Sequence, residues 1–245
     1  MNYKLIIFEK KEIMNKRTKK YVTKYTLEFF VIVLGISVSF LVQNIRKEKE
    51  LDLKRELIIR NLLNELESNQ AYITKKKDDF FREFDYVNRL LNNSLTQKKI
   101  KEYPTNYSPL NPFLSVVSFR PSRSIYNSLV NDGSFNFIEP PTLKALIDDV
   151  YKLNYNSIVN IIESEKKVAI EADRFFVNNH SEIYTKNFWF NFNDEKLTNS
   201  VFEIMQNDNH FKALMVQKIS YMEIKTSALE NYSKKRDALI KLLKK

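Results

Sequence analysis

An apolar run near the start of the chain constrains the fold more than any other feature. Residues 29–42 carry no charge, and the wider stretch 25–45 contains a single acidic or basic side chain, Glu28. At about 1.5 Å rise per residue, this wider stretch would span about 31 Å as a helix, close to the hydrocarbon thickness of a bilayer. The run therefore predicts one transmembrane helix over residues 25–45.

Two other interpretations of this run stay open. A buried core helix contains apolar stretches of similar length, but dense basic residues at both ends favour a membrane span. A cleaved signal peptide also begins with a basic region, and Ser-Val-Ser at 37–39 loosely resembles a cleavage site. The run continues over 40–42, which favours an uncleaved anchor. Translation from Met14 instead of Met1 would shorten the basic tail and leave the same anchor.

The basic excess of the chain lies mostly before the run. The formal net charge is +10, and residues 1–24 hold eight Lys or Arg against two Glu. Anionic lipid headgroups attract such a juxtamembrane cluster by roughly 1 kcal/mol per Lys or Arg. We therefore expect the lipid bilayer as a partner, and the near balance of charge in the remaining chain argues against nucleic acid.

The flanks of the run give only a weak signal for orientation. Residues 15–24 and residues 46–55 each carry five basic side chains, and only the second window contains acidic ones. The positive-inside count is therefore a tie. The absence of acidic side chains from the first window favours an N-terminus in the cytoplasm and a large domain outside it. The reverse orientation stays open.

Three residues of the run are candidates for helix packing in the membrane. Gly35 and Ser39 form a small-xxx-small pair that would let two helices approach closely, and Glu28 could reach headgroups or a partner. Self-association through the membrane is therefore one hypothesis for these positions.

The chain after the run predicts a long amphipathic helix. Residues 36–99 contain neither Pro nor Gly, which favours one uninterrupted helix. An apolar seam with steps of three and four predicts packing on a partner. It consists of Ile59, Leu62, Leu66, Asn69, Ile73, Phe80 and Phe84. A polar seam residue such as Asn69 can fix the register of an oligomer, or it can lie within an intramolecular bundle. The intramolecular interpretation is favoured.

Further helices follow, separated by two irregular connections. The Pro-rich connection covers 94–122, and the aromatic-rich one covers 178–195. Between them we expect a short helix over 124–131, which ends near Gly133, and a longer one over about 143–176. A last helix over about 199–243, interrupted near Asp208, has a seam at Met215, Ile219, Met222, Thr226 and Leu229.

The expected fold class is therefore all-α. A basic tail (1–24) precedes the transmembrane helix (25–45), which runs into the long amphipathic helix. A soluble helical bundle with coiled-coil-like seams then fills residues 46–245.

The counts of some residue types exclude several classes of site. The chain has no Cys and only two Gly, so disulfides, thiolate metal sites and Gly-rich phosphate loops are excluded. The only histidines are His180 and His210, and neither has a Glu three positions before it, as di-iron bundles require. We expect no cofactor, no metal and no catalytic site, although an enzyme of unfamiliar type stays open.

Two arginines and a tryptophan are candidate ligand contacts. Arg120 and Arg123 precede the short helix, where they could bind an anion, and Trp189 lies in the aromatic-rich connection. The favoured alternative is that both arginines tie the Pro-rich connection to acidic helix faces. The aromatic residues then form a lid over the bundle rather than an exposed binding patch.

Several segments together resemble a known family. They are 24–28, 31–37 and 43–44 around the run, 63–69 in the long helix, and 124–135. This set is similar to an uncharacterised family of single-pass helical membrane proteins common in Bacteroidota. Leu27 stands where that family tends to have Gly, and Asn44-Ile45-Arg46 replaces its usual exit from the apolar run. The resemblance implies a bacterial inner-membrane address and a helical domain, and it implies no activity.

The expected function is that of a non-enzymatic, single-pass membrane protein. Its helical domain would bind another protein or a second copy, as a subunit, adaptor or scaffold of an envelope complex. The alternative is a ligand-sensing or substrate-binding helical domain that uses Arg120, Arg123 and the aromatic stretch.

Overall fold

The structure is a computed structural model that describes residues 3–92, 110–185 and 194–244. Within these ranges the chain is helical and contains no strand, as the predicted all-α class requires. The chain divides into two compact units, Met1–Leu57 and Ile58–Lys245. Each unit is described separately below.

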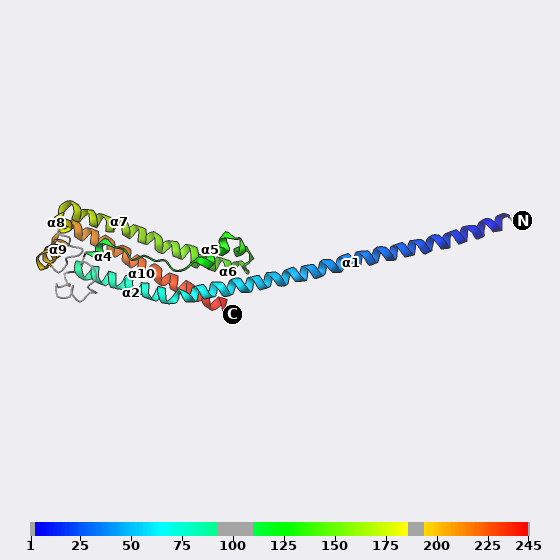
Figure 1. Cartoon of the computed structure of the whole chain (residues 1–245), viewed down its shortest axis with the longest axis horizontal. Helices are drawn as coiled ribbons and strands as arrows, with labels where there is room; N and C mark the ends of the chain where they lie inside the picture. Colours follow the sequence, from blue (N-terminus) through cyan, green and yellow to red (C-terminus); the bar gives the residue numbers. More distant parts are fainter. Residues whose placement is uncertain (1–2, 93–109, 186–193, 245) are drawn as a thin grey trace. The chain divides into compact units, whose positions relative to one another are not determined.

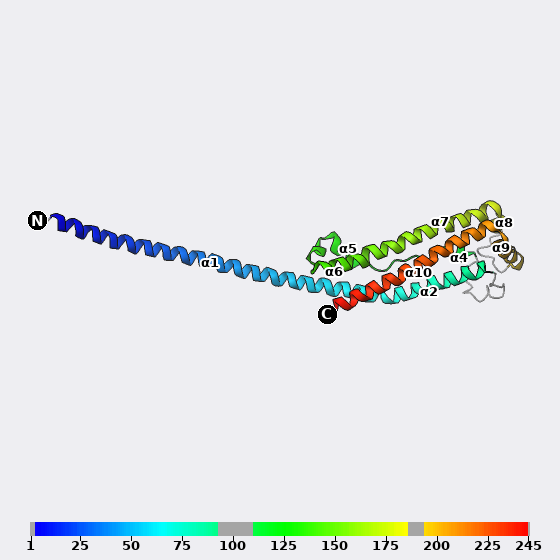
Figure 2. The same ribbon diagram turned by 180° about the vertical axis from the view of Figure 1, so that it is seen from behind.

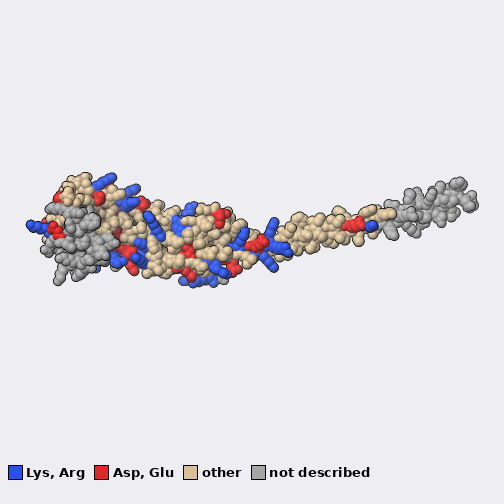
Figure 3. Space-filling model, viewed as in Figure 1, with Lys and Arg blue, Asp and Glu red and all other residues tan. Residues whose placement is uncertain are grey.

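The first unit is helical and belongs to α1 (Tyr3–Ser68; Figure 1). Among the described residues, one helix is long and apolar enough to cross a membrane. Its apolar window has a mean hydropathy of 2.1, and none of that window is buried inside the protein. Figure 3 shows this part of α1 as an uncharged surface with charged side chains on either side. Its length and composition agree with the predicted span over 25–45.

The predicted helix over 36–99 is described as far as residue 92, and within that part it is broken at Asn69. α1 ends at Ser68, and α2 (Gln70–Leu91) begins after Asn69, whose φ is −73° and ψ −11°. The Asn69 amide nitrogen donates to the Ser122 carbonyl at 2.8 Å, and the Ser122 N–H donates to the Asn69 amide oxygen at 2.8 Å. These bonds to a distant segment hold the turn that separates the two helices, and no Pro or Gly is needed.

Three long helices form the second unit. They are α2, α7 (Tyr155–Asn179) and α10 (Asn209–Leu243), and α10 packs against both of the others (Figures 1 and 2). The short helix α4 (Asn111–Leu114) contacts α7 and α2 and continues into extended chain that reaches α5. Its neighbourhood buries Leu110, Phe113 and Phe119. The described part of the predicted Pro-rich connection therefore lies between helices and contributes to the core.

Shorter elements complete the unit. They are α5 (Ser124–Asn131), η1 (Ser134–Phe137), α6 (Pro141–Asp148), the π-helical η2 (Asp149–Asn154), α8 (Glu182–Thr185) and α9 (Glu195–Asn207). The predicted helix over 124–131 and its end near Gly133, whose φ is 78°, are both observed. So is the interruption at Asp208, whose side chain accepts a bond from the Phe211 N–H at 2.8 Å.

The predicted helix over 143–176 contains a π turn. The Asn154 side chain donates to both the carbonyl and the carboxylate of Asp149, at 2.8 and 2.7 Å. The Tyr151 ring also stacks on Tyr126, with centroids 4.8 Å apart. These contacts accompany the extra residue in the turn, and the apolar periodicity alone does not reveal them.

The core of the second unit has two apolar clusters. The first includes Ile58, Leu62, Phe80, Phe119 and Leu239. The second includes Tyr86, Phe113, Phe176, Phe211 and Met222. The predicted seam matches the observed burial, because five of its residues are buried and Ile59 and Phe84 are half-buried. The five buried residues are Leu62, Leu66, Asn69, Ile73 and Phe80.

Candidate functional site

Four charged side chains lie inside the second unit, among residues of both apolar clusters. Glu83 belongs to α2, Glu165 to α7, and Lys218 and Lys225 to α10. Glu165 and both lysines have no exposed surface, and Glu83 is 8% exposed. Each occupies a core position of its helix, since neighbours such as Phe80, Ile162 and Met222 one turn away are buried too.

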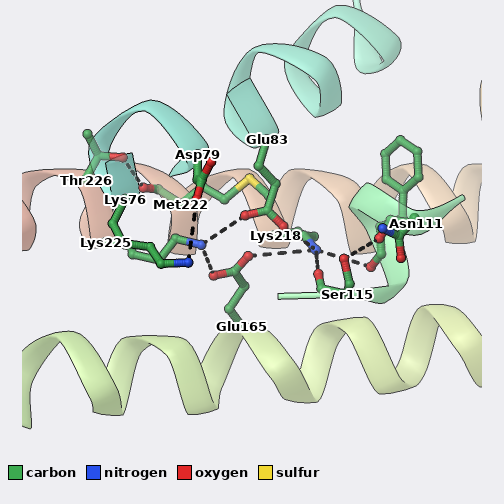
Figure 4. A network of polar contacts seen from close by, with 11 residues as sticks. Lys76, Asp79, Glu83, Asn111, Ser115, Glu165, Lys218, Met222, Lys225 and Thr226 are labelled. Carbon is green, nitrogen blue, oxygen red and sulfur yellow. Dashed lines mark hydrogen bonds and ion pairs between the residues drawn. The ribbon is translucent and has the colours of Figure 1, made fainter. Parts of the chain in front are cut away.

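The four groups form a ring of alternating charge (Figure 4). The Lys225 Nζ lies 2.5 Å from Glu165 Oε2 and 3.3 Å from Glu83 Oε2. The Lys218 Nζ lies 3.6 Å from Glu83 Oε1 and 3.8 Å from Glu165 Oε1. Two positive and two negative charges therefore compensate one another, which buried ions require in an apolar interior. We call this set the charge ring.

Burial shifts the pKa values of two members of the charge ring, Glu165 and Lys218, toward their neutral forms. The pKa of Glu165 is raised because desolvation outweighs its attraction to Lys225 and Lys218, and Glu83 raises it further. The pKa of Lys218 is lowered, mainly by desolvation, although both carboxylates oppose that shift. The ring thus contributes specific geometry to the core rather than a large electrostatic gain.

Lys218 also fixes the segment that follows α4. Its Nζ donates to the Ser115 carbonyl at 2.7 Å and to the Phe113 carbonyl at 3.3 Å. These carbonyls end a four-residue helix, where backbone acceptors lack helical partners. On the other side of the ring, Lys225 Nζ lies 4.4 Å from the centroid of the Phe80 ring, a cation–π distance. The ring therefore joins α2, α7, α10 and the extended segment in one register.

The charge ring is not among the residues predicted from the sequence. The seam predicted for the last helix passes through Ile219 and Thr226, which are half-buried. The buried face instead runs through Met215, Lys218, Met222, Lys225 and Leu229. The two lysines continue the steps of three and four, and this spacing is the signal for their burial, although Lys is ordinarily a solvent-exposed residue.

A further buried carboxylate, that of Glu65, caps the N-terminus of a helix. Glu65 is 5% exposed, and its Oε2 accepts from the Ile125 N–H at 2.7 Å and from the Ser124 hydroxyl at 3.0 Å. Glu65 of α1 therefore caps the N-terminus of α5, where free N–H groups favour an anion. The same carboxylate raises the pKa of the buried Tyr151 hydroxyl, adding to the larger effect of burial.

Two of the three residues predicted for ligand contact, Arg120 and Arg123, lie within the described chain. Arg120 is exposed, and its backbone N–H donates to the Tyr72 hydroxyl at 2.5 Å. The Arg123 guanidinium lies 3.9 Å from the centroid of the Tyr155 ring. Trp189 lies outside the described residues. Because Glu65 already binds the α5 N-terminus, binding of an external anion there stays a prediction.

The residues predicted for membrane helix packing lie in the first unit. The Ser39 hydroxyl donates to the Gly35 carbonyl at 2.9 Å, and Glu28 lies 3.8 Å from Lys24. The packing of these residues against another helix stays a prediction.

The two histidines lie near the far end of α7. The rings of His180 and His210 pack on Phe175, with centroids 5.4 and 5.7 Å away. Within the described ranges, no three His, Cys, Asp or Glu side chains gather as a metal site would require.

The described residues thus define a helical protein with an apolar N-terminal helix and a charge ring in its core. No family model matches the chain, and no curated protein or solved structure matches it. The resemblance to the Bacteroidota family therefore stays a prediction. Any role must be inferred from the geometry of this chain itself.

Proposed function

We propose that this protein is a single-pass membrane protein whose helical domain binds another protein, as a subunit, adaptor or scaffold of an envelope complex. The observation that carries the proposal is the apolar helix of the first unit. Its large side chains are exposed, as for Leu34 at 62% and Phe40 at 61%. A row of such side chains is stable in lipid and costly in water.

The connection between anchor and domain supports a scaffolding role. The helix that contains the apolar segment also contributes Leu62 and Leu66, both fully buried, to the domain core. Glu65 and Asn69 then bind the segment around Ser122. The chain therefore leads directly from the proposed anchor into the domain core.

The outer faces of the long helices offer apolar contacts for a protein partner. On α2, Phe80 is 1% exposed while Phe81 is 64% exposed. On α10, Val216 and Ile224 are 51% and 52% exposed. Large exposed aromatic side chains are common anchors of protein interfaces.

The proposed address is the bacterial inner membrane, with the N-terminus in the cytoplasm and the domain in the periplasm. The flanks carry equal numbers of basic side chains, and the support for this orientation is that only the flank after the apolar helix also contains acidic ones.

Membrane extraction and co-purification test the proposal together. The tagged full chain should stay in the membrane pellet after alkaline carbonate treatment. In a mild detergent it should co-purify with a partner in fixed stoichiometry. Phe81→Ser should lower that recovery, whereas Lys77→Ser, an exposed position one turn earlier, should not. Extraction by carbonate, or recovery of this chain alone as a monomer, would contradict the proposal.

A further inference from the structure

Two carboxylate oxygens of the charge ring receive no hydrogen bond from the described chain. They are Glu83 Oε1 and Glu165 Oε1, and both atoms are buried. The other oxygen of each carboxylate, Oε2, accepts from Lys225 Nζ, at 3.3 and 2.5 Å. Buried polar atoms in folded proteins are in the large majority bonded to a protein group or to an ordered water. The ring therefore has two acceptors that need a donor.

Both acceptors lie beside the same ammonium group. Lys218 Nζ is 3.6 Å from Glu83 Oε1 and 3.8 Å from Glu165 Oε1 (Figure 4). Opposite charges attract at these distances, but the distances exceed the length of an N–H···O hydrogen bond. An ammonium group has three N–H donors, and Lys218 directs two of them to the carbonyls of Phe113 and Ser115. One donor of Lys218 therefore remains for the side of the two acceptors.

We propose that the charge ring binds one water molecule, which accepts from Lys218 Nζ and donates to Glu83 Oε1 and Glu165 Oε1. The two hydrogens of a water match the two carboxylate oxygens, and its oxygen matches the remaining N–H of Lys218. Buried waters in proteins make about three hydrogen bonds to polar groups that would otherwise lack partners. The inference goes beyond the proposed function and does not depend on the membrane anchor.

The charges and the burial of the ring select water among possible ligands. In their ionised forms, the two carboxylates and two ammonium groups sum to zero net charge. A cation at this position would meet the ammonium of Lys218, and an anion would meet both carboxylates, so a neutral ligand is favoured. Lys218 and Glu165 have no exposed surface, so the ligand must be small. It must also both donate and accept, and water meets all three requirements.

The water extends the hydrogen bonds of the ring to a fourth element. Glu83 of α2 and Glu165 of α7 reach Lys218 of α10 through the water. Lys218 in turn holds the carbonyls of Phe113 and Ser115, at the end of α4 and just after it. A water that bridges two protein groups is nearly as favourable in enthalpy as a direct hydrogen bond. The bound water thus makes this side of the ring as well connected as the side that Lys225 occupies.

A crystal structure of the natural full chain, at a resolution that shows ordered water, tests the site without any substitution. A water oxygen should lie about 2.5–3.2 Å from Lys218 Nζ, Glu83 Oε1 and Glu165 Oε1. Direct contact between the two carboxylate oxygens would indicate a shared proton in place of the water and would overturn the inference. Direct hydrogen bonds from Lys218 to these oxygens, without a water peak, would overturn it as well.

A count of internal waters in solution provides a second test. Oxygen-17 magnetic relaxation dispersion counts the water molecules that stay inside a protein. Glu83→Leu combined with Lys225→Met removes one charge of each sign and one of the two acceptors. Lys218 keeps its bonds to the two carbonyls and can then contact Glu165 directly. The count should fall by one water molecule relative to the natural chain.

A second double variant is the matched control. Asp79→Leu combined with Lys76→Met removes an ion pair of 3.5 Å from the same helix α2 and leaves both Oε1 atoms of the ring in place. Its count of internal waters should equal that of the natural chain. An unchanged count in the ring variant, or an equal fall in both double variants, would overturn the inference. The crystal structure decides the question if the ring variant does not fold.

Discussion

The two units of the chain reverse the usual placement of apolar and charged side chains. In the first unit, apolar residues such as Phe30 and Leu41 are about 60% exposed. In the second unit, Glu165, Lys218 and Lys225 are fully buried. Exposed apolar surface is explained if lipid surrounds the first unit, and buried charge is explained by mutual compensation in the charge ring. The contrast shows that the stability of exposed or buried side chains in each unit depends on the medium around them, which we propose is lipid for the first unit and which is the protein interior for the second.

The largest effect is expected from breaking the charge ring. Lys225→Met removes the cation that lies 2.5 Å from Glu165 and leaves two buried carboxylates with one lysine. An uncompensated buried charge costs about 3–5 kcal/mol, so the free energy of unfolding should fall by that amount. Thermal unfolding of the full chain in mild detergent, followed by circular dichroism, measures the change.

A double variant sharpens this prediction. Lys225→Met combined with Glu165→Gln removes one charge of each sign and should recover much of the lost stability. If the double variant is as unstable as the sum of the two single variants, the ring is not a compensated unit.

A charge in the apolar helix should disrupt the first unit and leave the second intact. Leu34→Lys places an ammonium near the centre of the predicted span, where insertion experiments assign about 3 kcal/mol to Lys. The variant should shift from the carbonate-resistant to the extractable fraction. Its domain should unfold at the unchanged temperature in detergent. Full retention in the membrane would contradict a span at this position.

A moderate effect is expected at the cap of α5. Glu65→Ala removes the acceptor for the Ile125 N–H and for the Ser124 hydroxyl and should cost about 2 kcal/mol. Glu67→Ala, two residues further on, removes an exposed ion pair with Lys244 and should cost less than about 1 kcal/mol. If the two variants lose equal amounts of unfolding free energy, the cap formed by Glu65 contributes no more to stability than an exposed ion pair does. Thermal unfolding of both variants gives the comparison.

The smallest effect is a pH dependence of the charge ring. Because the pKa of Glu165 is raised by folding, the folded state binds its proton more tightly than the unfolded state does. This contribution to stability is complete below the ordinary pKa of Glu and is lost as pH rises through the folded pKa. Glu165→Gln cannot lose a proton, so the unfolding free energy of the natural chain should fall relative to this variant as pH rises. If the difference in unfolding free energy between the natural chain and Glu165→Gln does not change with pH, the pKa of Glu165 is not raised by folding.

The sequence predicted the elements more completely than the site. The helix over 124–131 and the interruption at Asp208 follow from local signals, such as Gly133 after a helix and an Asp that caps one. The turn at Asn69 and the π turn near Asn154 depend on contacts that no local pattern reveals. Lys225 meets Glu83, 142 positions away, and Glu165, 60 positions away. Compensation at such separations can be recognised only once the helices are placed side by side.

The central claim is that the apolar helix separates the tail and the domain across a membrane. Two single-cysteine variants test it directly: Lys16→Cys in the basic tail and Ser227→Cys on the exposed face of α10. A membrane-impermeant maleimide should label Ser227→Cys in spheroplasts before lysis and Lys16→Cys only after lysis. Labelling of both before lysis, or of neither, would place tail and domain on one side and contradict the account.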